Sequence, residues 1–346
     1  MEAEGTVPSE GLIPEVETER YVIEENRCVI GSDVGGTKMA VGAVDARGAI
    51  ILRHEAPSPA RDGEKMVTTL VELVNGCIEA ARSEGFEVVA VGIGAAGFIL
   101  HAEGVLMEAP NIAWSMVPLE KISTEATGLP SFLDNDANAA AAGEHFAGIC
   151  QGVDDFIYLT LGTGIGGGIF AGGRLYRGHR GTAAELGHMT VDPNGPVCGC
   201  GRKGCLEALA SGTALEREAA ALARLKKGSL LLEMTGGDLE LLTGEMVSAA
   251  AEKKDPAALE AFKRVAYYLG LGVVNLIHAF DPETVVLGGG VARSGHLLLD
   301  ELNEVVAANG IPSLIAGTTI TLSNLGGDAG LIGAGAIAWE GIGGPS

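Results

Sequence analysis

Basic residues are scarce in this sequence. It has 23 lysines and arginines against 45 aspartates and glutamates, which gives a formal net charge of −22 over 346 residues. A nucleic-acid backbone is repelled by a field of that sign, so DNA or RNA binding is disfavoured. We therefore expect no nucleic-acid partner. The length allows two domains or one large one.

Long uninterrupted apolar runs are also missing. Residues 156–173 and 305–327 lack charge, but the first stretch holds seven glycines and the second is broken by polar residues and Pro312. Neither could form a continuous apolar helix across ~30 Å of hydrocarbon. The N-terminus lacks the basic-then-apolar pattern of a secretory signal. These absences predict a cytoplasmic protein without a membrane partner, and residues 1–27, which are acidic, are expected to form a solvated tail.

Glycine, in contrast, is abundant. The 53 glycines are about 15% of the chain, roughly twice the ~7% of an average protein. They follow no three-residue period, which excludes a collagen-like chain. Instead they occur in short groups beside apolar runs, as expected for tight turns and for loops where the backbone approaches a ligand. With 47% hydrophobic residues, the chain can bury a sizeable core.

Short apolar strands alternate with helical patterns along the chain. Apolar residues recur at helical spacing over Lys65–Ala81, and Asp255-Pro256 opens a long apolar helix to about Ala279. Thr213 and Glu216 form a capping-box pattern before a further helix that Gly228 could end. This alternation predicts an α/β fold. The expected strands include Cys28–Ser32, Met39–Val44, Val88–Ile93 and Val285–Leu287.

One pattern occurs in both halves of the sequence. Residues 29–44 comprise an apolar strand, a glycine turn and a second apolar strand, and residues 156–175 repeat that order. Two such hairpins indicate a duplicated domain that closes on one ligand from both sides.

The glycine turns resemble known nucleotide motifs only in part. Gly92–Gly97 and Gly162–Gly167 both match G-x-G-x-x-G, but each leads into an apolar strand and not a helix, which disfavours a nicotinamide site. Gly31–Lys38 narrowly misses a P-loop. Phosphate binding remains open, because successive glycines let backbone N–H groups point into one concavity. The alternative for each turn is a tight hairpin without a ligand.

Side chains in these turns could add to such a site. Thr37 and Thr163 offer hydroxyl donors, Lys38 offers charge, and Asp33 could hold a hydrated magnesium ion.

The six cysteines fall into two groups. Cys28, Cys77 and Cys150 lie in apolar surroundings, as core cysteines do. The other group, joined by one histidine, comprises His188, Cys198, Cys200 and Cys205. A Cys3His set suits tetrahedral zinc, and four protein ligands indicate a structural ion. A disulfide framework is the alternative, but the chain looks cytosolic and the group holds an odd number of thiols.

Two glutamates flank the cysteine group. Glu185 lies three residues before His188 and Glu207 two residues after Cys205, so a zinc ion would hold both carboxylates near one place. Taken alone, either could be a solvated surface charge.

Together these residues resemble the ROK family of sugar kinases and repressors, over nearly all of 28–339. The segments that carry the resemblance are Asp33–Lys38, Pro110–Trp114, Asn135–Asn138, Leu161–Gly164, Glu185–His188, Cys198–Glu207 and Leu287–Gly290. The resemblance implies an actin-like, ribonuclease-H-like α/β fold of two duplicated domains with an interdomain cleft. By resemblance the small domain comprises 28–134 with 327–346, and the large domain comprises 135–326 with a zinc loop at 188–205.

The resemblance also implies roles for individual residues. Asp136 would be the general base, although by itself it could equally cap a helix over Ala137–Phe146. His188 would bind zinc through one ring nitrogen and sugar through the other. The expected sugar ligands are Gly97, Asn111, Asn135, Glu185, His188 and Glu207. The expected ligands of ATP and Mg²⁺ are Asp33, Gly35, Gly36, Thr37, Lys38, Gly162, Thr163, Gly164, Gly288 and Gly289.

Within the family, Phe280–Gly290 and Leu325–Ala334 are most similar to glucokinases. The resemblance thus implies transfer of the ATP γ-phosphoryl group to the 6-hydroxyl of glucose, in a homodimer or homotetramer. N-acetylmannosamine, N-acetylglucosamine and fructose are alternative substrates, polyphosphate is an alternative donor, and a non-catalytic sugar sensor is an alternative function. The repressors carry an N-terminal DNA-binding domain, for which the 27 acidic residues here are too few and of the wrong charge.

Overall fold

The computed structural model describes residues 26–109, 112–226 and 228–345. Nearly all of the acidic tail and the expected sugar ligand Asn111 therefore lie outside the described residues. Within the described residues, no helix is both long enough and apolar enough to cross a bilayer.

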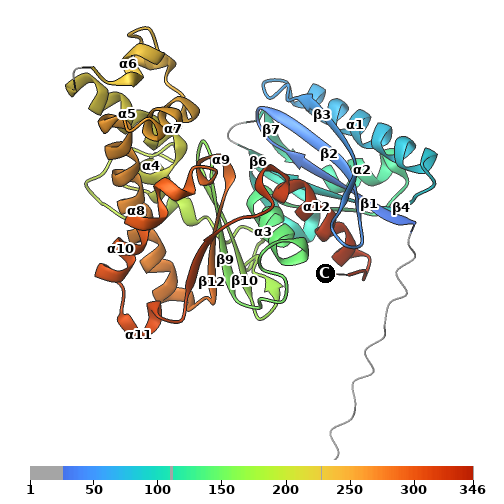
Figure 1. The fold of residues 1–346 in the computed structure, drawn as a ribbon. Helices are drawn as coiled ribbons and strands as arrows, with labels where there is room; N and C mark the ends of the chain where they lie inside the picture. Colours follow the sequence, from blue (N-terminus) through green and yellow to red (C-terminus); the bar gives the residue numbers. More distant parts are fainter. Residues whose placement is uncertain (1–25, 110–111, 227, 346) are drawn as a thin grey trace, which may run out of the picture.

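A five-stranded sheet forms the first half, in the order β3-β2-β1-β4-β8 (Figure 1). Its strands are β1 Arg27–Val34, β2 Lys38–Asp45, β3 Ile50–Pro57, β4 Glu87–Ala95 and β8 Ser131–Asn135. β1, β2 and β3 form an antiparallel meander, whereas β4 and β8 are added parallel to β1. A small antiparallel sheet is inserted after β4 and comprises β5 Phe98–Leu100, β6 Val105–Ala109 and β7 Trp114–Val117.

The second half repeats this topology. Its sheet has the order β11-β10-β9-β12-β13, with β9–β11 antiparallel and β12 and β13 added parallel to β9. The strands are β9 Phe156–Leu161, β10 Ile165–Ala171, β11 Arg174–Leu175, β12 Thr284–Gly288 and β13 Thr319–Leu322. The duplication expected from the two hairpins is therefore confirmed.

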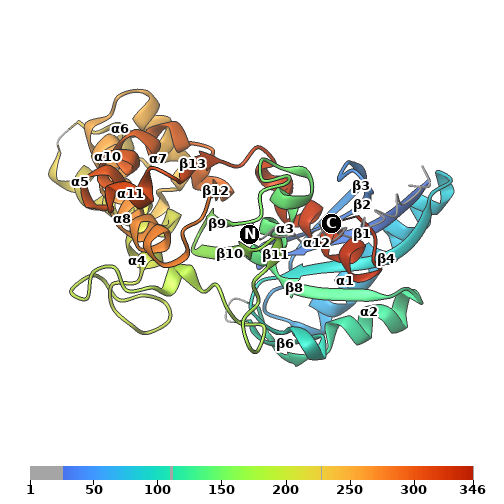
Figure 2. The same ribbon diagram turned by 90° about the horizontal axis from the view of Figure 1, so that it is seen from below.

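Helices cover both faces of each sheet, which is why the central strands are almost continuously apolar. On β1, Cys28 and Ile30 pack in the core with α1, whereas Val29 packs in the core that includes α12. Helices α4 to α8 gather at the far end of the second half (Figures 1 and 2). The helices are α1 Gly63–Ser83, α2 Leu119–Thr127, α3 Asp136–Ala147, α4 Leu206–Ala210, α5 Gly212–Leu225, α6 Leu230–Met234, α7 Gly244–Glu252, α8 Pro256–Phe280, α9 Gly289–Ala292, α10 Leu299–Asn309, α11 Pro312–Ile315 and α12 Ala329–Gly341.

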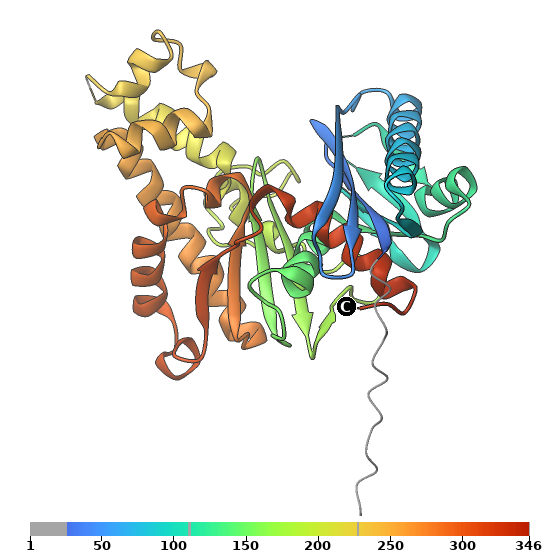
Figure 3. The ribbon, with the colours of Figure 1, turned by 45° about the vertical axis from the view of Figure 1, so that its right-hand side comes forward.

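Helices α3 and α12 cross between the two sheets (Figure 3). They share one core cluster that includes Phe156 and Tyr158 of β9. Their backbones meet at glycines: a Cβ on Gly333 would lie almost on the carbonyl oxygen of Ala139, and one on Gly143 would collide with that of Ala329. The close crossing joins the two halves. Because α3 contacts both sheets, the expected domain boundary at residue 135 stays a prediction.

Most predicted elements are present within two residues of their expected ends. The predicted capping box is wrong, however, because the N-cap of α5 is Ser211, whose hydroxyl accepts from the backbone N–H of Ala214. The hydroxyl of Thr213 instead donates to the carbonyl of Thr163, and a carboxylate oxygen of Glu216 accepts from the N–H of Gly244. The helix ends at Leu225, before Gly228.

Candidate active site

A cleft of about 530 Å³ lies between the two halves and is lined by residues of both. It lies at the carboxyl ends of the parallel strands β4 and β8, where open α/β sheets bind ligands. Twelve of the expected site residues line it: Gly35, Gly36, Thr37, Gly97, Asn135, Asp136, Gly162, Thr163, Gly164, Glu185, His188 and Glu207.

Asp136 is the first residue of α3, but it is not the N-cap. That role belongs to Asn135, whose side-chain oxygen accepts from the backbone N–H groups of Ala137 at 2.9 Å and Asn138 at 3.2 Å. The Asp136 carboxylate accepts from the N–H of Ala137, at 2.9 Å. Burial raises the pKa of Asp136, against the lowering effect of hydrogen bonds from that N–H, from its own backbone and from the Asn135 side chain. Asp136 can therefore exchange a proton with a group in the cleft.

Asn135 has little hydrogen-bonding capacity left for a ligand. Its side-chain amide donates to the carbonyl of Gly97 at 3.1 Å, so a single amide hydrogen remains. Gly97 has a φ of +133°, and a Cβ there would meet the backbone of Glu108 and Ala109. Glycine is thus required at this side of the cleft.

Three polar side chains meet at the other side of the cleft. A carboxylate oxygen of Glu207 accepts from the backbone N–H of Ile165 at 3.1 Å, which fixes Glu207 on the start of β10. The other oxygen lies 4.0 Å from Nδ1 of His188. Burial raises the pKa of Glu185, as do the charges of Asp136 and Glu207, while His188 lowers it. The negative charges of Asp136 and Glu207 therefore act on the Glu185 carboxylate.

Both glycine hairpins are fixed by bonds from outside the turn. Ser58 donates from its hydroxyl to the carbonyl of Gly35 at 2.6 Å and from its N–H to the carbonyl of Thr37 at 2.9 Å. No sequence motif includes Ser58, which follows the last residue of β3, so sequence reasoning could not identify it. In the second hairpin, the N–H of Gly212 donates to the carbonyl of Gly162 at 2.7 Å. These bonds hold both turns in place.

Four expected ligands do not line the cleft. Lys38 bonds to Glu55 through Nζ at 3.2 Å. Gly288 pairs with Thr160, and Gly289, at φ +84°, packs on the backbone of Leu161, so this turn adjoins the second hairpin.

The fourth is Asp33, which lies opposite Gly94 in the β1–β4 pairing, close to the start of α3. Burial, with a contribution from the charge of Asp136, raises its pKa to about 6. A carboxyl group in that position is neutralised most readily by a proton or a cation.

The cysteine group forms a compact set of possible metal ligands. Each of the four residues offers one ligand atom, and these atoms all lie within 4.8 Å of one another: Nδ1 or Nε2 of His188 and Sγ of Cys198, Cys200 and Cys205. The sulfurs of Cys200 and Cys205 are 3.6 Å apart, as are Sγ of Cys198 and Nδ1 of His188. Two thiolates on one tetrahedral zinc would be about 3.8 Å apart, given Zn–S bonds of ~2.3 Å. The donor set therefore fits zinc, with Nδ1 as the histidine ligand.

Two sheets of one repeated topology, facing a shared cleft, define an actin-like ATPase fold. Within that class the sequence places the chain more narrowly. The chain belongs to the ROK family, whose family model matches residues 29–340.

Relatives and solved structures agree with this assignment. The chain is 40% identical over 318 residues to a glucokinase of Streptomyces coelicolor, covering 90% of this chain and 97% of that one. It is similar to the crystal structure of a ROK family glucokinase from Streptomyces griseus in complex with glucose and AMPPNP, with a TM-score of 0.80, 40% identity and 90% and 99% coverage. A xylose repressor of Caldicellulosiruptor bescii is 34% identical over 279 residues, which span 80% of this chain and 69% of the repressor.

Proposed function

We propose that this protein is a glucokinase, which transfers the γ-phosphoryl group of ATP to the 6-hydroxyl of glucose. The observation that carries the proposal is the position of Asp136. Asp136 lines the cleft together with the two glycine hairpins and the polar side chains of Glu185, His188 and Glu207. Its carboxylate is not needed as a helix cap, because Asn135 is the N-cap of α3. The 40% identity to glucokinases over nearly the whole chain supports the same reaction.

In this reaction Asp136 accepts the proton of the attacking hydroxyl. The oxygen forms a bond to the γ-phosphorus while the bond to the leaving ADP oxygen breaks, and the proton passes to the carboxylate. A pKa raised by burial suits a base that must hold that proton. The sugar would be held by Glu185, His188 and Glu207, with Asn135 and Asn111 completing the set.

The two hairpins would bind the nucleotide phosphates. Gly35–Thr37 and Gly162–Gly164 line the cleft, where their backbone N–H groups and the hydroxyls of Thr37 and Thr163 would bind phosphate oxygens. The Gly288–Gly289 turn, which adjoins the second hairpin, would contact the adenosine. Mg²⁺ neutralises charge on the transferring phosphoryl group, and Asp33 would hold it through water. Zinc on the Cys3His set would fix His188 and, through it, the sugar side of the cleft.

A coupled assay of ADP release tests the proposal. Glucose, N-acetylmannosamine, N-acetylglucosamine and fructose are each offered with Mg-ATP, and glucose also with polyphosphate. The largest kcat/KM is expected for glucose with ATP. Turnover of another sugar in preference would change the substrate, and no turnover of any sugar would contradict the kinase function and favour a sugar sensor.

We further propose that the protein is a homodimer or homotetramer in the cytoplasm. Sedimentation equilibrium gives the oligomeric state directly, and a single species at the monomer mass would contradict this proposal.

A further inference from the structure

A buried carboxylate, that of Asp134, directly precedes Asn135, the N-cap of α3, and the proposed base Asp136. Asp134, the next-to-last residue of β8, is completely buried. One of its oxygens accepts from the backbone N–H of Asn135 and from the side-chain amide of Asn138, both at 2.8 Å. Asp134 therefore holds the first turn of α3, the turn that begins with Asp136.

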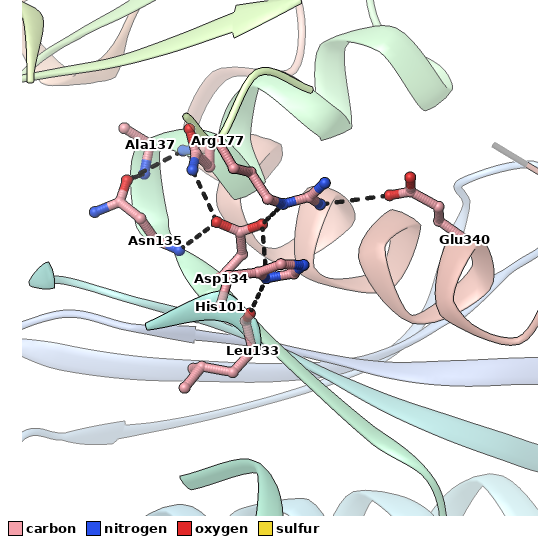
Figure 4. Close-up of polar contacts among 8 residues, drawn as sticks. His101, Leu133, Asp134, Asn135, Ala137, Arg177 and Glu340 are labelled. Carbon is pink, nitrogen blue, oxygen red and sulfur yellow. Dashed lines mark hydrogen bonds and ion pairs between the residues drawn. The ribbon is translucent and has the colours of Figure 1, made fainter. Parts of the chain in front are cut away.

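The second oxygen of Asp134 is bound from the other half of the molecule (Figure 4). Nε of Arg177, two residues beyond β11, donates to it at 2.6 Å. Nη2 of the same guanidinium lies 3.5 Å from the Glu340 carboxylate on α12. His101 lies beside the pair, with Nδ1 3.2 Å from the carbonyl of Leu133 and 3.8 Å from Asp134. Arg177 thus links a strand of the first half, a segment of the second half and the helix between them.

The segment that follows Arg177 leads to the sugar side of the cleft. The N–H of Ala183 donates back to the carbonyl of Arg177 at 3.2 Å. Gly181, at φ +89°, packs against the backbone of Ile99 and His101. Glu185 lies two residues after Ala183, so the bond from Ala183 to Arg177 ties the segment before Glu185 to the Asp134–Arg177 pair.

Burying the charge of Asp134 beside the partly buried Arg177 costs several kcal/mol, and well-packed apolar residues would often be as stable. Here the pair joins two parts of one site. Building on the proposed function, we propose that Asp134 and Arg177 are positioning residues, which set the start of α3 with Asp136 against the segment that carries Glu185. A misplacement of about 1 Å at such a site can lower the rate roughly 10²-fold.

Two variants distinguish a positioning role of the Asp134–Arg177 pair from a role of Arg177 that only neutralises the buried Asp134 charge. Arg177→Met leaves the Asp134 charge unpaired and is expected to lower the thermal midpoint strongly. The double variant Asp134→Asn, Arg177→Met removes both charges but keeps an oxygen for Asn135 and Asn138, so most of the stability should return. Its kcat/KM for glucose should nevertheless stay about 10²-fold below that of the natural protein. Arg177→Lys, which retains the charge, should recover part of the rate.

The pattern of kinetic constants adds a second readout. The KM for ATP should change less than about twofold in the double variant, because neither hairpin bonds to the pair, while kcat falls and the KM for glucose rises. A double variant that regains both stability and full activity would overturn the proposal, and so would an equal loss for ATP and glucose. Arg264→Met serves as the control, because it removes exposed ion pairs to Glu218 and Glu260 far from the cleft.

Hydrogen exchange tests the linkage without relying on turnover. Residues 178–188 should exchange faster in the double variant than in the natural protein, whereas α8 should be unchanged. If the natural protein turns over no sugar, the proposed function fails, and this exchange measurement still decides whether the pair fixes the segment. Unchanged exchange over 178–188 would overturn the linkage.

Discussion

Asp136 illustrates how one neighbouring residue decides the role of another. At the start of a helix an aspartate is a good cap, and the sequence left both roles open. In the structure Asn135 accepts from the two backbone N–H groups that an N-cap serves, which leaves the Asp136 carboxylate for the cleft.

Asp136→Asn is expected to lower kcat by at least about 10²-fold, the usual contribution of a positioned base. The helix should remain, because its cap is Asn135, and glucose binding should be largely intact. Steady-state kinetics and calorimetry with glucose measure the two effects separately. Loss of glucose binding together with activity would show that Asp136 acts chiefly in the structure.

The raised pKa of Asp33 should make the free energy of unfolding depend on pH. Its pKa of about 6 in the folded protein lies above the ordinary 3.8, so the folded state binds the proton more tightly than the unfolded state. The ionised form thus lowers stability above pH 6, and this effect fades as pH falls toward 4. Asp33→Asn should therefore raise the free energy of unfolding by about 1–3 kcal/mol at pH 8 and by little at pH 4. Denaturant titrations at both pH values measure this, and an equal effect at the two would contradict it.

At the scale of elements, the start of α5 separates helix stability from nucleotide binding. Ser211 caps the helix, whereas Thr213 bonds to the second hairpin at Thr163. Ser211→Ala should cost about 1 kcal/mol of stability and leave the KM for ATP unchanged. Thr213→Val should cost little stability and raise the KM for ATP roughly threefold to tenfold, as loss of one hydrogen bond predicts. A loss of stability in Thr213→Val and a raised KM for ATP in Ser211→Ala would contradict these roles and favour Thr213 as the helix cap.

The cysteine loop carries the proposed zinc ligands His188, Cys198, Cys200 and Cys205. Cys200→Ser should lower the bound zinc measured by atomic spectroscopy, and it should raise the KM for glucose because Glu207 lies 3.4 Å from the sulfur of Cys198. Cys77→Ala, in the core of the first half, is the control and should keep its zinc. Unchanged metal content in Cys200→Ser would refute the ligand set.

At the scale of the whole molecule, the crossing of α3 and α12 joins the two halves through backbone contact. Gly333→Ala should destabilise the protein by about 1–3 kcal/mol, because its Cβ would meet the backbone of Ala139, which cannot yield cheaply. Gly76→Ala is the matched control: it lies inside α1 with open space at its Cβ, and it should stabilise by about 0.5–1 kcal/mol. Denaturant unfolding of both variants measures the contrast. Equal effects would show that the crossing is not tightly packed.

Part of the high glycine content is explained by helix packing around α12. From the sequence, the glycines were expected mainly in turns and at ligand loops. Several instead let α12 lie directly on its neighbours: a Cβ on Gly92 of β4 would collide with the carbonyl of Ala334, and one on Gly31 of β1 with that of Leu331. Glycine thus serves the packing of α12 on the first sheet and on α3 as well as the cleft.

The sequence by itself determined the main strands and helices, the duplication, the glycine turns and the cysteine group, because apolar periodicity and residue spacing are local patterns. The sugar-side residues and the base were expected from the resemblance to the ROK family. Only the tertiary structure decided that Asn135, and not Asp136, caps α3, and that Ser211, and not Thr213, caps α5. It also decided that Lys38 bonds to Glu55 and does not line the cleft. Each of these depends on which of several neighbouring groups reaches a partner distant in the chain. The link from Arg177 to Asp134 is of the same kind, since 43 residues separate two side chains that no motif joins.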